Sequence, residues 1–200
     1  MLILALLLLA LVAVPLTGGR LERLTQLGLE RQRLIVVALL LQVLAISVVP
    51  GWPRPVLVAA HLASYGLAAA FVWLNRRVAG VPLVALGAAL NAVTIALNGG
   101  TLPASPSALR QAGITTPPGE FVNSAALADP RLGFLGDVFA SPAWLPLRNV
   151  YSVGDALILA GAVYAIHVTC RRPTRAQRRR SAATPSWAKA TRLAAAGTQG

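Results

Sequence analysis

Two aspartates are the residues of this chain best suited to chemistry by type and spacing. Asp137 and Asp155 each follow a glycine. Two carboxyl groups held close together act as a general acid and base, or bind a cation. We therefore take both as candidate catalytic residues. Ser152 and Asp155 also have the Ser-x-x-Asp spacing of a capping box, which would make Asp155 a helix-capping residue instead.

Polar side chains inside apolar runs form a second group. Asn91, Thr94 and Asn98 are spaced by three and four residues, so they share one helix face. His61 and Ser64 follow the same spacing in an earlier run. Such residues are costly in a membrane and face the interior of a helical bundle. They would line a binding site, or would only join helices through hydrogen bonds.

Asn98 also begins the pattern Asn-Gly-Gly, which is typical of a helix C-terminus because glycine adopts the left-handed conformation found there. Asn149 opens the segment that leads into the last apolar run and ends at Asp155. The candidate binding residues are thus Asn91, Asn98, Gly99, Gly100, Asn149 and His61.

Metal and cofactor motifs do not occur in the sequence. The chain has no His-x-x-x-His pattern and a single cysteine, Cys170. Nucleotide-binding and hydrolase motifs are also missing. We therefore expect no metal site and no cofactor.

The elements that carry these residues are apolar helices. Hydrophobic residues make up 56% of the 200 residues and charged residues 12%, with a mean hydropathy of +0.66; soluble chains contain about 25% charged residues. A bilayer is crossed by roughly 17–25 helical residues, whose backbone bonds are internal. The sequence predicts an all-α membrane protein, a bundle of about five transmembrane helices with one long external loop. The predicted spans are residues 2–17, 34–50, 56–74, 81–98 and 152–170.

Basic residues are distributed unevenly between the connections. Fourteen of the 18 Lys and Arg residues lie in connections that alternate with those carrying the other four. Because basic residues mark the cytoplasmic side, we expect a bacterial plasma-membrane protein with its N-terminus outside and its C-terminus in the cytoplasm. The external loop then spans residues 99–151. Its aromatic residues favour an ordered loop with short helices on the membrane surface over a disordered one.

Residues 171–200 form a basic tail that we expect to be disordered. Six arginines lie between Arg171 and Arg180, and anionic headgroups attract each basic residue near a membrane by about 1 kcal/mol. Aromatic residues do not alternate with these arginines, as they do in many nucleic-acid-binding segments. We expect the tail to bind anionic lipid headgroups and no nucleic acid.

Four short segments resemble one known family. They are Gly18-Gly19-Arg20-Leu21, Asn98-Gly99-Gly100-Thr101-Leu102-Pro103, Phe134-Leu135-Gly136-Asp137 and Asn149-Val150-Tyr151-Ser152-Val153-Gly154-Asp155. With the order of the apolar runs, they make residues 1–170 similar to the small bacterial multi-pass membrane proteins called domain of unknown function 5317. Leu102 stands where the family pattern has methionine. The resemblance implies a shared fold and membrane location, and it implies no activity.

Three functions are compatible with these residues. The lack of catalytic motifs favours a non-catalytic accessory or scaffold protein with a membrane-protein partner over an enzyme. The first alternative is an enzyme that acts at the outer leaflet on a lipid or lipid-linked substrate through Asp137 and Asp155. The second is a pathway for small solutes or ions along the polar helix faces, which is disfavoured because the chain lacks the internal repeats of many transporters.

Overall fold

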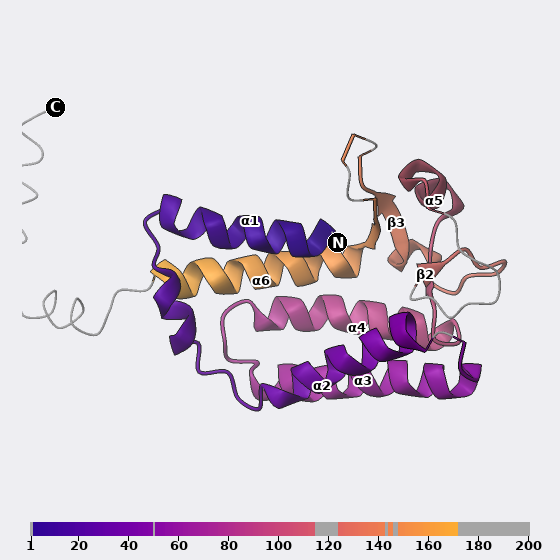
Figure 1. The fold of residues 1–200 in the computed structure, drawn as a ribbon, viewed down its shortest axis with the longest axis horizontal. Helices are drawn as coiled ribbons and strands as arrows, with labels where there is room; N and C mark the ends of the chain where they lie inside the picture. Colours follow the sequence, from indigo (N-terminus) through magenta and orange to yellow (C-terminus); the bar gives the residue numbers. More distant parts are fainter. Residues whose placement is uncertain (1, 50, 115–123, 143, 146–147, 172–200) are drawn as a thin grey trace, which may run out of the picture. The chain divides into compact units, whose positions relative to one another are not determined.

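The computed structural model describes residues 2–49, 51–114, 124–142, 144–145 and 148–171 (Figure 1). The tail from residue 172 onward, predicted to be disordered and to bind lipid headgroups, lies outside the described residues. Of the arginine run that begins the tail, the structure describes Arg171 alone.

All five apolar runs form helices, so the mostly helical architecture is confirmed. The helix ends differ from the predicted spans by at most two residues when the π-helix η2 (Leu44–Val48) is counted with α2, which it continues. A short 3-10 helix, η1 (Leu21–Gln26), follows α1. The α-helices of the described residues are α1 (Leu2–Leu16), α2 (Arg33–Val43), α3 (Arg54–Leu74), α4 (Val81–Leu97), α5 (Pro106–Ala112) and α6 (Val153–Arg171).

Two of these helices, α3 and α6, are long and apolar enough to cross a membrane. Only 17% and 22% of their most apolar stretches are buried in the protein. A core helix of a soluble protein with this composition would be mostly buried. Large apolar side chains of the shorter helices are exposed as well, such as Leu9 at 63%, Leu16 at 82% and Leu40 at 62%.

The long helices pack through small residues. α2 packs on α3, and α3 packs on α4. α4 crosses α6 in antiparallel fashion, with Gly87 against Gly154 and Gly80 against Gly161. A β-carbon at any of these four glycines would collide with backbone atoms of the other helix or with side chains beside them. Backbones that approach this closely are typical of helix contacts in membranes.

The described residues between α4 and α6 (99–114, 124–142, 144–145 and 148–152) form a folded cap, whose strands correct the all-α prediction. It holds α5, a 3-10 turn η3 (Gly133–Leu135) and short strands. β1 (Leu102–Pro103) pairs in parallel with β2 (Ser124–Ala125), and β3 (Asp137–Ala140) pairs antiparallel with β4 (Val150–Ser152). Periodicity did not reveal strands this short. The cap has a small core of its own, formed by Ala104, Ala108, Leu109, Ala112 and Val150.

Glycine makes the cap's connections possible. A β-carbon at Gly136 would collide with the carbonyl oxygen of Pro103, so only glycine lets η3 lie against β1 here. The bridge between Ala104 and Asp137 and the hydrogen bond from the Ser105 N–H to the Asp137 carbonyl (3.0 Å) continue this contact. Two of the family-like segments, residues 98–103 and 134–137, thus meet inside the cap.

Candidate functional site

Asn91 of α4 joins its helix to the start of α6. Its Nδ2 donates to Oδ1 of Asp155 at 2.8 Å, and its Oδ1 accepts from the hydroxyl of Ser152 at 2.8 Å. Asn91 and Ser152 are buried. Because both ends of the amide are satisfied inside the protein, the pairing stabilises the contact between α4, β4 and α6. We call these three residues the α4–α6 joint.

Ser152 and Asp155 form the capping box predicted from their spacing. The Ser152 N–H donates to Oδ2 of Asp155 at 3.2 Å, and the Asp155 N–H donates to the Ser152 hydroxyl oxygen at 3.0 Å. Each side chain thereby satisfies a backbone N–H at the start of α6. Both oxygens of the Asp155 carboxylate accept hydrogen bonds, one from the cap of its own helix and one from Asn91.

Gly154 explains how Asn91 reaches this helix start. A β-carbon at residue 154 would overlap Oδ1 of Asn91 and crowd the Gly87 carbonyl oxygen. Gly154 is not among the candidate residues predicted from the sequence. The equal spacing of Gly80 and Gly87 and of Gly154 and Gly161 is the pattern that indicates such a helix contact.

Asp137 lies beside the joint. It begins β3 opposite Ser152 of β4 and is 3% exposed. Its Oδ1 has no hydrogen-bond partner among the described residues. Burial raises the pKa of Asp137 to about 6; the Ser124 hydroxyl beside it lowers the pKa in part, although it makes no hydrogen bond of ordinary geometry, and the charge of Asp155 raises it. Burial first, and the charge of Asp155 in addition, thus hold the pKa of Asp137 well above its ordinary value.

The polar face of α3 carries the candidate residue His61. His61 is buried and meets the ring of Tyr65 edge to face, with centroids 5.4 Å apart. The Ser64 hydroxyl donates to the His61 carbonyl within the same helix at 2.6 Å. Tyr65, which is absent from the candidate residues, thus packs against His61 on this face of α3.

Asn98, Gly99 and Gly100 end α4, as their sequence predicts. Gly99 and Gly100 have φ values of +65° and +93°, and the Gly100 N–H donates to the Ile95 carbonyl at 2.9 Å. Asn98 holds the cap, since its Nδ2 donates to the Arg131 carbonyl and its Oδ1 accepts from the Arg131 N–H, both at 2.8 Å. These residues position the cap on α4.

Asn149 takes part in a different contact. Its N–H donates to the Ser141 hydroxyl oxygen at 2.9 Å, and its carbonyl accepts from the Ser141 N–H at 2.8 Å. These bonds close the β3–β4 hairpin. The contacts of Asn149 therefore do not join it to Asn91 or Asp155.

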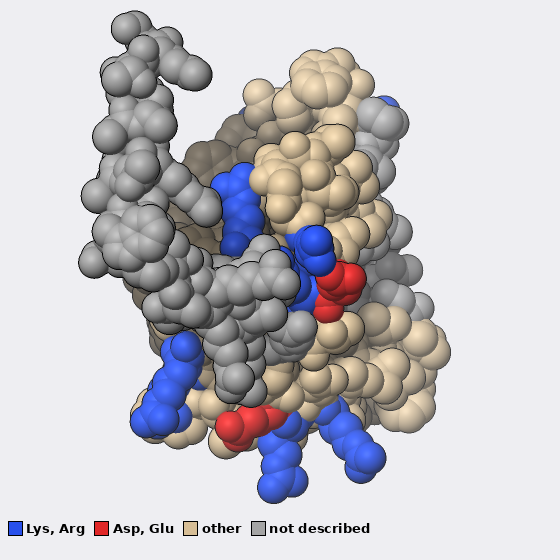
Figure 2. Space-filling model, turned by 90° about the vertical axis from the view of Figure 1, so that its left-hand side faces the viewer, with Lys and Arg blue, Asp and Glu red and all other residues tan. Residues whose placement is uncertain are grey.

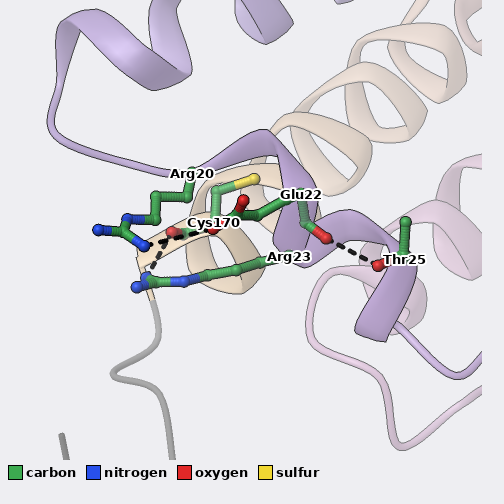
Figure 3. A network of polar contacts seen from close by, with 5 residues as sticks. All are labelled: Arg20, Glu22, Arg23, Thr25 and Cys170. Carbon is green, nitrogen blue, oxygen red and sulfur yellow. Dashed lines mark hydrogen bonds and ion pairs between the residues drawn. The ribbon is translucent and has the colours of Figure 1, made fainter.

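A polar network at the C-terminal ends of α1 and α6 was not predicted (Figure 3). Arg23 of η1 is 8% exposed, and its Nη1 donates to the Cys170 carbonyl at 2.9 Å; the Arg20 N–H donates to the same oxygen at 3.1 Å. A cation at a helix C-terminus complements the helix dipole and satisfies an end carbonyl. The position of Arg23 shortly after the Gly18-Gly19 break was the only hint in the sequence.

Metal binding finds no support in the arrangement of ligands. Among the described residues, no three His, Cys, Asp or Glu side chains gather in a way that could hold a metal ion. The joint instead offers one carboxyl group, one amide and one hydroxyl, and the buried carboxyl group of Asp137 lies beside it. A carboxyl group with a raised pKa can donate or accept a proton.

Comparisons with known proteins found a match to a family profile. Residues 26–167 match the profile of a family of unknown function, DUF5317. The matched range contains the α4–α6 joint and the whole cap, and it excludes the Gly18–Leu21 segment. Neither the curated proteins nor the solved structures gave a match.

Proposed function

The chain belongs to the DUF5317 family, and we propose that it is a five-span plasma-membrane protein that serves as a non-catalytic scaffold for a membrane-protein partner. The spans are α1, α2 with η2, α3, α4 and α6. The exposure of large apolar side chains along these helices supports their contact with lipid.

Charge distribution supports the orientation. The C-termini of α1, α3 and α6 and the N-termini of α2 and α4 lie at one end of the bundle (Figure 1). Figure 2 views this end and shows basic side chains gathered on it. The connections here carry Arg20, Arg23, Arg31, Arg33, Arg76 and Arg77. The positive-inside rule assigns this end to the cytoplasm and the cap to the outside.

The use of polar residues at the joint carries the scaffold proposal. Asn91, Ser152 and Asp155 hydrogen-bond one another and the start of α6, so each of these side chains helps to hold the helices and the cap together. The cap nevertheless turns large aromatic side chains outward. Phe134 is 69% exposed and Trp144 is 81% exposed, as expected of anchor residues in an interface.

Photo-crosslinking in the native membrane tests the scaffold. A photoreactive phenylalanine in place of Trp144 should give a discrete adduct with one membrane protein. The abundance of that membrane protein should fall in cells from which the chain is deleted. The matched control places the same group at Leu39 of α2, which is 55% exposed and faces lipid in this proposal. The absence of any discrete adduct at Trp144, or equal adducts at both positions, would contradict a scaffold that binds through its cap.

The second candidate function is the outer-leaflet enzyme. One observation favours it: Asp137 is buried beside Asp155 with a pKa of about 6, which suits a general acid or base near neutral pH. Asp137 would donate or accept the proton, and the charge of Asp155 would only help to raise the pKa of Asp137. For this candidate function, Asp137 must take part in a reaction and not only pack inside the cap.

Complementation separates the two candidates. Cells that lack the chain are supplied with wild type or with Asp137→Asn, and their outer-leaflet lipids and lipid-linked intermediates are compared by mass spectrometry. A scaffold predicts that Asn, which is nearly the same size, restores the wild-type profile. Failure of a folded, membrane-inserted Asp137→Asn variant to restore it would favour the enzyme.

A further inference from the structure

A groove between α3 and α4 runs along the surface of the bundle. Its volume is about 400 Å³, and it is open to one side. Small side chains form its floor and walls: Ala68, Ala69, Ala85, Ala88, Ala89 and Ala92. Tyr65 lies at one end and Arg76 at the other.

The length of the groove corresponds to one leaflet. Tyr65 and Arg76 lie about three helical turns apart, a rise of about 16 Å, which is roughly half of a 30 Å hydrocarbon core. Arg76 follows the end of α3 on the side where basic residues gather. An acyl chain that enters the groove from the cytoplasmic boundary would therefore reach Tyr65 near mid-bilayer.

The cationic end of the groove is preorganised. The Arg76 guanidinium lies over the Trp73 ring, 4.5 Å from its centroid, and its Nη1 donates to the Trp73 carbonyl at 2.8 Å. Among the described residues, this guanidinium makes no other hydrogen bond and no ion pair. Stacking on an aromatic ring fixes the orientation of an arginine and leaves its other N–H groups directed away from the ring.

A second, polar cleft meets the groove at Arg76. Its volume is about 310 Å³, and Arg76, Arg77, Glu30 and Asn75 are among its lining residues. Asn75 fixes the wall of the cleft, since its Oδ1 accepts from the Glu30 N–H at 2.8 Å and its Nδ2 donates to the Glu30 carbonyl at 3.1 Å. The apolar groove and the polar cleft thus share one arginine.

We infer that the groove and cleft together bind one phospholipid of the cytoplasmic leaflet. One acyl chain lies along the alanines, and the phosphate accepts hydrogen bonds from Arg76 and Arg77. The Glu30 carboxylate accepts from an N–H or O–H of the headgroup, such as that of an ethanolamine. The choice of a phospholipid over a partner helix rests on this charge complementarity at the membrane boundary. The inference depends on the proposed membrane insertion.

Native mass spectrometry of the delipidated full chain in detergent tests the site. Dioleoyl phosphatidylethanolamine is titrated in parallel with dioleoylglycerol, which lacks the phosphate, and with dioleoyl phosphatidylcholine, whose headgroup has no N–H donor. We expect one phosphatidylethanolamine to bind at least about tenfold more tightly than dioleoylglycerol, the effect of one charge-assisted hydrogen bond. Inorganic phosphate should not compete. Equal binding of phospholipid and dioleoylglycerol, or displacement by phosphate, would overturn the inference, and equal binding of the choline lipid would overturn the role of Glu30.

Matched variants locate the site. Ala69→Leu fills the groove, whereas Ala70→Leu adds the same side chain to the neighbouring exposed position, which does not line it. Arg76→Gln removes the phosphate partner, whereas Arg33→Gln removes another arginine at the same end. Ala69→Leu and Arg76→Gln should weaken binding about tenfold, and both controls should leave it unchanged. Equal effects of a variant and its control would overturn the inference. So would variants that change the self-association of the chain and leave lipid binding unchanged. If labelling shows the proposed topology and no lipid is bound, this inference fails while the membrane topology stands.

Discussion

The side-chain amide of Asn91 occupies the space that a β-carbon at residue 154 would take. This fixes the two positions to each other, because Asn91 reaches Ser152 and Asp155 only over a glycine. The joint between α4, the cap and α6 therefore combines close backbone packing with a satisfied polar network.

Gly154→Ala should destabilise the protein by about 1–3 kcal/mol, the usual cost of overpacking. The added methyl group would displace the Asn91 amide or separate α4 from α6. Gly66→Ala is the control, since a β-carbon at that position of α3 meets nothing within 4 Å and alanine favours helix. Unfolding by denaturant in detergent measures the stability of both variants. A Gly154→Ala variant as stable as wild type would show that the helix contact accommodates the methyl group without loss of stability.

Asn91→Ala should cost about 1–3 kcal/mol because Ser152 would remain buried without its partner. A double-mutant cycle with Ser152→Ala should give a coupling energy of about 0.5–3 kcal/mol. Val93→Ala, at an exposed position of the same helix, controls for side-chain truncation. Strict additivity of the Asn91 and Ser152 variants would contradict the hydrogen bond between them.

Asp137 should make stability depend on pH. Its pKa is raised from 3.8 to about 6, so the folded state binds the proton more tightly than the unfolded state. The resulting stability is fully present below about pH 4 and is lost as the pH rises through about 6, a difference on the order of 3 kcal/mol. Melting curves in detergent between pH 4.5 and 8 should show this loss in wild type and a smaller one in Asp137→Asn. Parallel profiles would show that other groups cause the dependence.

Arg23→Gln should destabilise the contact between α1 and α6 by about 1–3 kcal/mol, because the buried guanidinium donates to the Cys170 carbonyl. Arg20→Gln is the matched control. Its side chain pairs with Glu22 at 3.4 Å while both side chains are mostly exposed, at 63% and 72%, and such pairs contribute little. Equal losses of stability in the two variants would contradict the capping role of Arg23.

The sequence predicted the helices because an apolar run has few alternatives in a membrane. Ser152 and Asp155 were recognisable as a capping box, and Asn98-Gly99-Gly100 as a helix end, because both patterns are local. The strands of the cap escaped prediction because their pairing depends on contacts between distant residues, such as Asp137 with Ser152. The hydrogen bonds of Asn91 with Ser152 and Asp155 also join segments far apart in the sequence, so no local pattern could indicate them.

Side-specific labelling tests most directly the claim that the cap lies outside and the arginine-rich end inside. In a Cys170→Ser background, Ser107→Cys in the cap and Glu22→Cys in η1 are treated with a membrane-impermeant maleimide in intact cells. We expect labelling of residue 107 in intact cells and of residue 22 only after permeabilisation. Labelling of residue 22 in intact cells, with residue 107 protected until permeabilisation, would contradict it.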